Sequence, residues 1–270
     1  MSWIILVSGA VVGLSLGLTG GGGALLAVPL LTYGAGLSAR EAVGLSLASV
    51  GTTSLIGGWQ RARRGLVEFP TGLLFATAGM LGAPLGSWLA ARLPETWLLA
   101  LFAALMIAVA IRLWRTATDA ASRLPILSDD VAGPVCRRDP AGQLFLTSRC
   151  AALLAGIGLL TGILSGLFGV GGGFVIVPAL VMFSGMGIQR AIGTSLLAIT
   201  LISAAGTTSH LLAGHDLSAG ALGQFTAGSV SGMFAGTWLA HRLAGATLQR
   251  VFAVVVILLA GYILLRSFWS

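Results

Sequence analysis

Long apolar runs constrain this chain more than any other feature of its sequence. Eight stretches dominated by apolar residues alternate with short polar breaks, and they span residues 4–34, 42–58, 71–92, 95–114, 151–187, 191–209, 218–242 and 247–268. A helix needs about 20 such residues to cross the hydrocarbon core of a bilayer. The pattern therefore predicts an all-α polytopic membrane protein with about eight transmembrane segments.

The charged residues agree with a membrane location and exclude one class of motor. Only 9% of the residues are charged, against about 25% in soluble domains. All 15 basic residues are arginines, so the lysine of a nucleotide-binding P-loop is missing. The net charge of +7 comes from arginines at the ends of apolar segments, as the positive-inside rule places them. We therefore expect membrane lipids, and no nucleic acid, as partners.

The second half of the chain repeats the first. At an offset of 149 residues, nine of the 19 positions in 13–31 are identical to those in 162–180. Farther along, at an offset of 150, GSWLAARL at 86–93 matches GTWLAHRL at 236–243 in six of eight positions. We predict two homologous four-segment repeats, 1–114 and 149–270, joined by a polar linker at 115–148.

Each repeat starts with a segment that glycines and a proline should break. Pro29 and Pro178 follow the two glycine clusters at equivalent distances, and a proline in a helix interior removes a further backbone bond. Open backbone and half-helix N-termini at membrane depth attract anions, so we expect the clusters to cradle substrate. The cluster residues are Gly20, Gly21, Gly22 and Gly23 in the first repeat and Gly169, Gly171, Gly172 and Gly173 in the second.

Other glycines have the spacing of close helix packing. Four GxxxG sets favour helix contacts rather than binding, namely Gly13 with Gly17, Gly162 with Gly166, Gly82 with Gly86, and Gly228 with Gly232 and Gly236.

The distribution of arginines depends on whether the broken segments cross the membrane or turn back. If both cross, the two sides hold ten and five arginines. If both are re-entrant, the sides hold twelve and three, with Arg40, Arg92 and Arg266 on the poorer side. The stronger asymmetry favours re-entrant segments, and hence an inverted repeat. The crossing alternative stays open, because residues 4–19 could nearly span a thin bilayer by themselves.

Neutral hydroxyls are the candidate substrate contacts, because almost no ionisable group lies within a span. We expect contacts from Ser46, Thr52, Thr53, Thr194, Ser195 and Thr207, in two equivalent segments that also carry Ser54, Ser203, Thr208 and Ser209. The alternative is that these hydroxyls bond their own or neighbouring helices. Arg61 aligns with His210, and the pair could gate the path, attract anions, or anchor segment ends at the interface.

Three other chemistries have little support in the sequence. His210, His215 and Asp216 lack a nearby His or Cys that would complete a metal site. Ser15 lies in a GxSxG string, but a nucleophile elbow needs a strand–turn–helix setting rather than an apolar run. Cys136 and Cys150 suggest neither a disulfide framework nor a metal cluster.

These motifs together resemble the TauE/SafE family of membrane transporters. The resemblance covers essentially the whole chain and lies in GLFGVGGGFVIVPAL, AIGTSLLAIT and SHLLAGHDL of the second half. The first half has GLTGGGG, VGLSLAS and WQRARRG in the corresponding places.

This resemblance implies a bacterial plasma-membrane permease that exports sulfite or organosulfonates such as sulfoacetate, without an organic cofactor. A secondary transporter of this kind could work by alternating access and could form a homodimer. The alternatives are a channel-like pore, a carrier for another anion, an intramembrane hydrolase and a non-transporting membrane scaffold.

Overall fold

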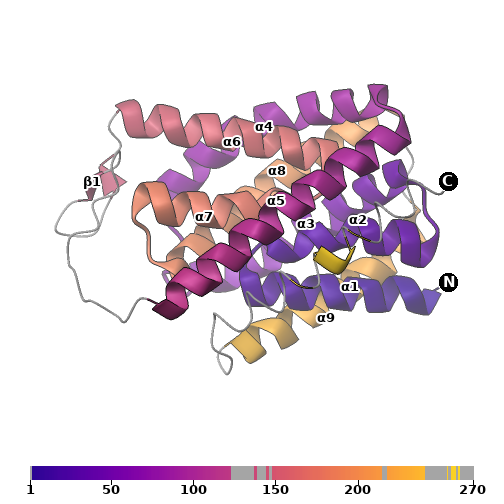
Figure 1. Cartoon of the computed structure of the whole chain (residues 1–270), viewed down its shortest axis with the longest axis horizontal. Coiled ribbons are helices and arrows are strands. Elements are labelled where there is room, and N and C mark those ends of the chain that lie inside the picture. Colours follow the sequence, from indigo (N-terminus) through magenta and orange to yellow (C-terminus); the bar gives the residue numbers. More distant parts are fainter. Residues whose placement is uncertain are drawn as a thin grey trace.

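The computed structural model describes residues 2–122, 137–138, 144–145, 148–214, 218–240, 254, 257–259 and 261. The first half contains α1 (Ser2–Thr19), the 3₁₀ helix η1 (Gly22–Leu26), α2 (Ala27–Pro29), the π-helical η2 (Leu30–Gly34), α3 (Ala39–Ala62), α4 (Phe69–Arg92) and α5 (Glu95–Ser122). The second contains α6 (Ser148–Phe168), α7 (Gly173–Ser184), α8 (Ile188–Leu212) and α9 (Ala219–Ala240) (Figure 1). The predicted all-α class is thus confirmed for the described residues, apart from a pair of two-residue strands, β1 (Arg137–Arg138) and β2 (Leu144–Phe145).

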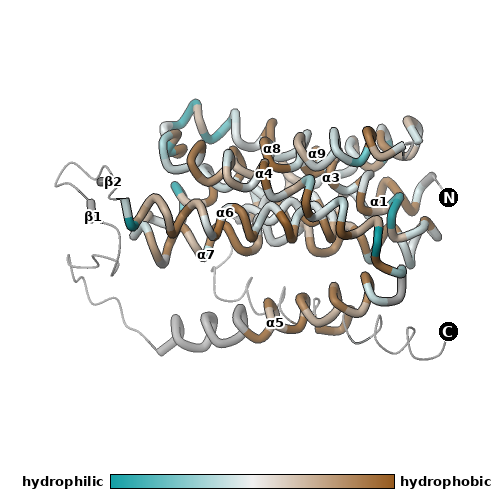
Figure 2. The backbone as a smooth tube through the Cα atoms, turned by 90° about the horizontal axis from the view of Figure 1, so that it is seen from above, coloured by the Kyte–Doolittle hydropathy of each residue, from teal (hydrophilic) through white to brown (hydrophobic). Residues whose placement is uncertain are grey.

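Helices α3 and α8 contact each other in the bundle, and two further helix pairs flank them. Helix α1 packs against α9, while α4 packs against α6 and also against α8. Each flanking pair therefore joins the first helix of one half to the third segment of the other. Figure 2 shows α5 as a separate layer beside this bundle.

The GxxxG glycines lie at these helix contacts, as predicted. A Cβ on Gly13 would collide with the carbonyl of Ser229, and one on Gly162 with the carbonyl of Gly79. Gly82 meets Leu159 in the same way. Because backbone faces backbone at these positions, only glycine allows the helices to approach so closely.

The facing residues also give the direction of each helix. Along α1, Gly9, Gly13 and Gly17 face residues of increasing number in α9, so these two helices run parallel. Along α3, in contrast, Gly51 faces Ser203 while Gly58 faces Leu196. Helices α3 and α8 are therefore antiparallel, although they are equivalent in the two halves.

The first broken segment turns back on the helix that precedes it. Gly23 lies against Val12 and Leu16 of α1, while Gly34 lies near Ile4 and Ser8. Residues 22–34 therefore retrace α1 toward its start. In the second half, Gly172 lies against Thr161 and α7 contacts α6. Both broken segments therefore fold back, as the re-entrant alternative requires.

The predicted linker at 115–148 begins inside a helix. Helix α5 continues beyond residue 114 to Ser122, and residues 115–122 contain three alanines and neither glycine nor proline. Cys150, buried at the start of α6, is disulfide-bonded, which the sequence analysis did not predict. Cys136 lies outside the described residues.

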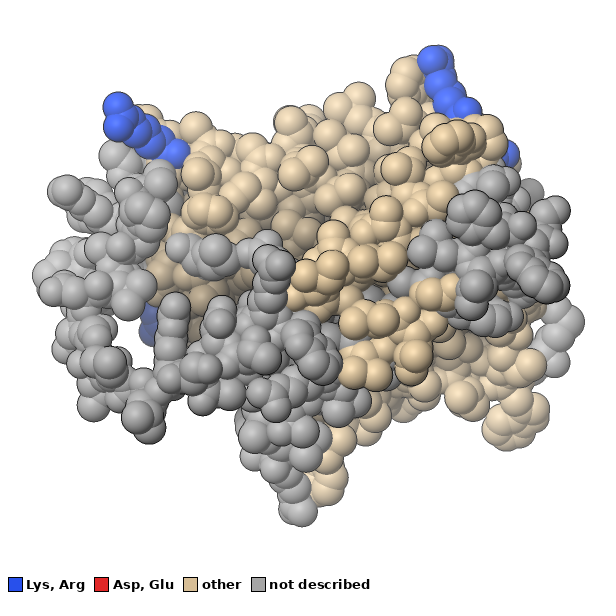
Figure 3. All heavy atoms as spheres, in the orientation of Figure 1, with Lys and Arg blue, Asp and Glu red and all other residues tan. Residues whose placement is uncertain are grey.

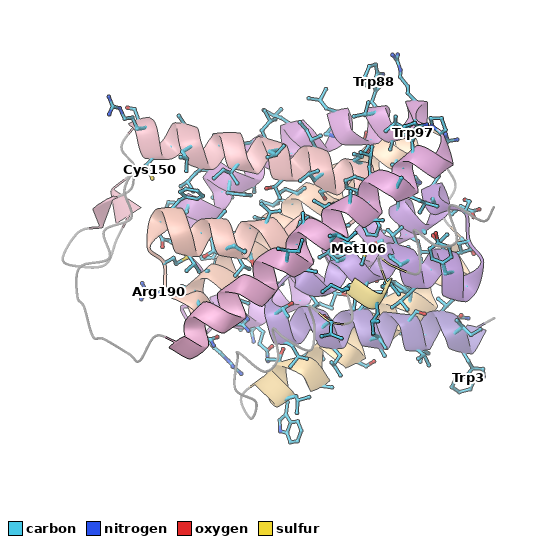
Figure 4. All side chains as sticks on the ribbon, in the orientation of Figure 1. Trp3, Trp88, Trp97, Met106, Cys150 and Arg190 are labelled. Carbon is cyan, nitrogen blue, oxygen red and sulfur yellow. The ribbon has the colours of Figure 1, made fainter. Side chains whose placement is uncertain are left out.

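Among the described residues, α3, α4, α6 and α8 are long and apolar enough to cross a membrane. Shorter apolar helical stretches cover Trp3–Thr19, Gly22–Gly34 and Trp97–Ile111. Exposed Trp3, Trp88 and Trp97 lie at one end of the bundle, and Cys150 and Arg190 lie at the other (Figure 4). Large aromatic side chains near the ends of apolar helices are typical of the membrane interface.

Candidate functional site

The two glycine breaks meet inside the bundle. Helix α1 ends at Thr19 and α6 ends at Phe168, directly before the clusters. Gly20, Gly169, Gly171 and Gly172 all have positive φ angles between 65° and 74°, a conformation that other residues rarely adopt. A Cβ on Gly21 would lie 2.7 Å from the Cα of Gly173. The breaks predicted from the sequence are therefore present, and their backbones touch.

Two equivalent serines hold the breaks, each from the opposite half. The Ser46 hydroxyl on α3 donates to the carbonyl of Gly169 at 2.6 Å. The Ser195 hydroxyl on α8 donates to the carbonyl of Gly20 at 2.9 Å and to that of Ile192 at 2.8 Å. Both serines are fully buried. In this conformation they support the broken backbone of the other half rather than face an open site.

The other predicted hydroxyls are not brought together. Thr52 is exposed and donates to Ala48 of its own helix, and buried Thr53 donates to Ser49 in the same way. The Thr194 hydroxyl accepts a hydrogen bond from the backbone N–H of Glu68 and so holds the loop before α4. Thr207 differs, because its buried hydroxyl oxygen has no hydrogen-bond partner.

Two cavities lie toward opposite ends of the α3–α8 pair. The first, a small pocket called the His210 cavity, is lined by Arg40, Val43, Ser87, Ala90, Ala91, Leu98, Gly166, His210 and Ala213. The second, a smaller pocket called the Arg61 cavity, is lined by Leu16, Gly17, Gly57, Gln60, Arg61, Ile192, Leu196, Met233 and Thr237.

The duplication relates the two cavities to each other. Four lining positions correspond between the halves, and they pair Val43 with Ile192, Ser87 with Thr237, Gly166 with Gly17 and His210 with Arg61. The predicted correspondence of Arg61 and His210 thus places His210 in one cavity and Arg61 in the other, and Arg40 also lines the His210 cavity.

In each half, a single residue lies between the cavity and a glycine break. Val43 lines the His210 cavity, and its backbone lies against Gly169. Ile192 lines the Arg61 cavity, and its side chain fills the space beside Gly20. The glycine clusters themselves are buried and line neither cavity. The expected cradles are therefore closed in this conformation.

The ends of α3 and α8 are held differently at the two cavities. At one end, Arg61 donates to the side chain of Gln189 at 3.1 Å and so links α3 to α8. Gln189 corresponds to Arg40, which instead donates to the carbonyls of Ala91 and Leu93 at the end of α4. The sequence did not identify Arg40, Gln189, Ser87 or Thr237 as site residues. The repeat could have done so, because the offset of 149 residues pairs Arg40 with Gln189 and the offset of 150 pairs Ser87 with Thr237.

The charged side chains that the structure describes lie at the ends of the bundle. Arg61, Arg63, Arg64, Arg149 and Arg190 belong to helix ends near the Arg61 cavity, whereas Arg40 and Arg92 belong to the other end. On the face shown in Figure 3, basic side chains lie near the two ends of the long axis, and the described atoms between them belong to uncharged residues.

Other chemistries find no support in the described part of the chain. No group of three His, Cys, Asp or Glu residues able to hold a metal occurs among the described residues, and His215 and Asp216 lie outside them. Ser15 lies inside the continuous helix α1, so its GxSxG string lacks the strand–turn–helix setting of a nucleophile elbow.

Comparisons with known proteins agree with the resemblance seen in the motifs. The family model described as "Sulfite exporter TauE/SafE" matches residues 5–263. A "Probable membrane transporter protein" of Xylella fastidiosa is 36% identical over 270 residues, which covers 97% of this chain and 95% of the relative. The "Probable membrane transporter protein YunE" of Bacillus subtilis is 28% identical over 223 residues, or 80% of each chain. No solved structure matches significantly. The chain belongs to the TauE/SafE family of membrane transporters.

Proposed function

We propose that the protein is a secondary transporter that exports sulfite or an organosulfonate across the bacterial inner membrane by opening its two cavities alternately. The observation that carries this proposal is the pair of equivalent cavities at opposite ends of the bundle, with two touching glycine breaks between them. A carrier needs one access route to each side and a closed centre between them.

The antiparallel arrangement of α3 and α8 supports this mechanism. If the long helices cross the bilayer, equivalent helices that run in opposite directions make an inverted repeat. Such a pair can exchange the conformations of its two halves, because each half can adopt the state of the other. Re-entrant segments give each half an odd number of crossings, as an inverted repeat requires.

The distribution of arginines supports one orientation. Arg61, Arg63, Arg64, Arg149 and Arg190 lie at the end with the Arg61 cavity, and Arg40 and Arg92 lie at the other end, so the positive-inside rule favours a cytoplasmic location for the Arg61 cavity. Arg61 would then attract the anion from the cytoplasm, and the His210 cavity would release it outside. The Arg61–Gln189 hydrogen bond closes the cytoplasmic end in the conformation described here.

A carrier fits the closed centre better than a channel-like pore. In the described part of the chain, buried glycines and the side chain of Ile192 separate the two cavities. A carrier of this kind should show flux that saturates with substrate and should exchange substrate across the membrane. A pore would show neither property.

Flux into proteoliposomes tests the proposal. Purified protein is reconstituted with sulfite or sulfoacetate on one side, and the movement of each anion is followed with and without proton and sodium gradients. We expect saturable flux above that of protein-free liposomes. If no sulfur anion moves under any gradient, the proposed function is wrong, and the scaffold interpretation replaces it.

A further inference from the structure

Among the buried hydroxyls without a hydrogen-bond partner, Ser54 and Ser203 are the two serines that the repeat offset pairs. Ser54 on α3 and Ser203 on α8 are fully buried, and neither hydroxyl oxygen has a hydrogen bond. Neighbouring hydroxyls behave differently, since Thr53, Thr200 and Thr208 each donate to the carbonyl four residues earlier in their own helix. Burying a hydroxyl without a partner is unfavourable, so these two positions need an explanation other than packing.

The two serines occupy equivalent positions in the two central helices. They are 149 residues apart, which is the offset of the repeat. Ser203 faces Gly51 of α3, and its hydroxyl oxygen would lie 3.2 Å from a Cβ on Gly171 in the second break. The unpaired hydroxyl therefore lies beside backbone that only glycine can form. Two equivalent orphan hydroxyls suggest one shared function rather than two accidents of packing.

Each serine is the first of three residues along one face of its helix, here called a stripe, and each stripe ends at one cavity. Ser203, Thr207 and His210 have the spacing i, i+4, i+7 and so share one face of α8, which ends in the His210 cavity. The Thr207 hydroxyl oxygen is also buried without a partner. On α3, Ser54, Gly58 and Arg61 have the same spacing and lead to the Arg61 cavity.

We infer that Ser54 and Ser203 are the hydroxyls that bind the anion between the two cavities. Unpaired polar side chains at membrane depth mark substrate pathways, because lipid and apolar packing cannot satisfy them. The inference rests on the proposed transport function and names the contacts within it. Ser46 and Ser195, in contrast, are bonded to the broken backbone.

The chemistry of the stripe narrows the class of substrate. Within 42–60 of α3 and 191–209 of α8 there is no arginine, lysine or histidine, so neutral donors meet the anion at the centre. Such donors suit a small oxyanion with several acceptor oxygens, which a sulfite or sulfonate group provides. Without a fixed positive charge the anion is held weakly and can leave again. The extra hydroxyl of Thr207, where the other stripe has Gly58, places the tighter half of the site toward the His210 cavity.

Alanine variants in proteoliposomes test this inference. Ser54→Ala and Ser203→Ala should each raise the KM for sulfite about tenfold, as expected for the loss of one hydrogen bond to a charged group. The double variant should raise it further. Thermal unfolding should occur at the wild-type temperature or above it, because each substitution removes an unsatisfied hydroxyl. Thr208→Ala is the matched control on α8, since Thr208 is exposed and bonds its own helix.

The outcomes separate this inference from the proposed function. If wild-type protein transports sulfite and both serine variants keep the wild-type KM, the inference is wrong while transport stands. If wild-type protein moves no sulfur anion, the proposed function itself fails. A second readout is the reaction of Ser203→Cys with a thiol reagent: we expect labelling that sulfoacetate slows, and labelling that sulfoacetate leaves unchanged would contradict the inference even if the alanine variants failed to fold.

Discussion

The two glycine breaks start at equivalent positions but continue differently. After the first break the chain forms a 3₁₀ turn, three residues of α-helix and a π-helical turn, whereas after the second it forms the single helix α7. Gly172, at positive φ, caps α7, while Gly22 already belongs to the 3₁₀ turn. The two halves therefore share the position of the break and the serine that bonds it, but not the path of the chain that follows.

The largest expected effect concerns the contacts that the two halves share. Gly13→Leu and Gly162→Leu should both prevent stable folding, since each places a side chain against a facing carbonyl in α9 or α4. Overpacking of this kind costs about 3 kcal/mol or more. The yield of monodisperse protein after detergent extraction measures the effect.

Gly156→Leu is the matched control for this prediction. Gly156 lies in α6, as Gly162 does, but has open space around the position of a Cβ. We expect this variant to behave like the wild type. Normal yields for Gly13→Leu and Gly162→Leu would contradict the helix contacts described above.

The next largest effect compares how much an alanine destabilises each of the two breaks. Gly171→Ala should destabilise the protein by about 1–2 kcal/mol, because Gly171 has a φ of 65° that alanine adopts poorly. Gly22→Ala should cost less, because Gly22 has the backbone of a 3₁₀ turn. Thermal unfolding in detergent compares the two variants. Equal losses would show that the breaks are more alike than the structure indicates.

A smaller effect would compare the two serines that hold the breaks. Ser46→Ala and Ser195→Ala should each lower stability by about 1 kcal/mol, the value of one hydrogen bond. The loss should be larger for Ser46, whose single bond to Gly169 is the shorter one. We expect the KM for sulfite to stay unchanged in both. A raised KM would instead support the original prediction that these serines contact substrate.

The smallest effect concerns the two ends of the central helices. Gln189→Ala removes the exposed bond from Arg61 and should cost less than about 1 kcal/mol. It should nevertheless make the Arg61 cavity more accessible, which labelling of Thr237→Cys would detect. Arg40→Ala serves as the comparison at the other end, where the bonds go to α4. No change in labelling for Gln189→Ala would mean that this bond does not close the cavity.

Part of the candidate site was predictable, because it depends on local sequence. The breaks and the helix contacts at the GxxxG glycines follow from residue type. The equivalence of Arg61 and His210 in the two halves follows from the repeat offset. The hydrogen-bond partner of each hydroxyl was not predictable. Whether Ser46 bonds its own helix, another half or a substrate depends on which backbone lies opposite, and residue 169 is far away in sequence.

The helical membrane class, the internal repeat and the two places where helices break are predictable from the residues alone. These follow from apolar length, periodicity and the backbone freedom of glycine, which act over a few residues. The tertiary structure was needed to show that the broken segments turn back, that α3 and α8 run antiparallel, that Arg40 lines the His210 cavity, and that Gln189 bonds Arg61 at the other end. Those features depend on contacts between distant segments, and apolar periodicity alone cannot specify which helices meet or in which direction.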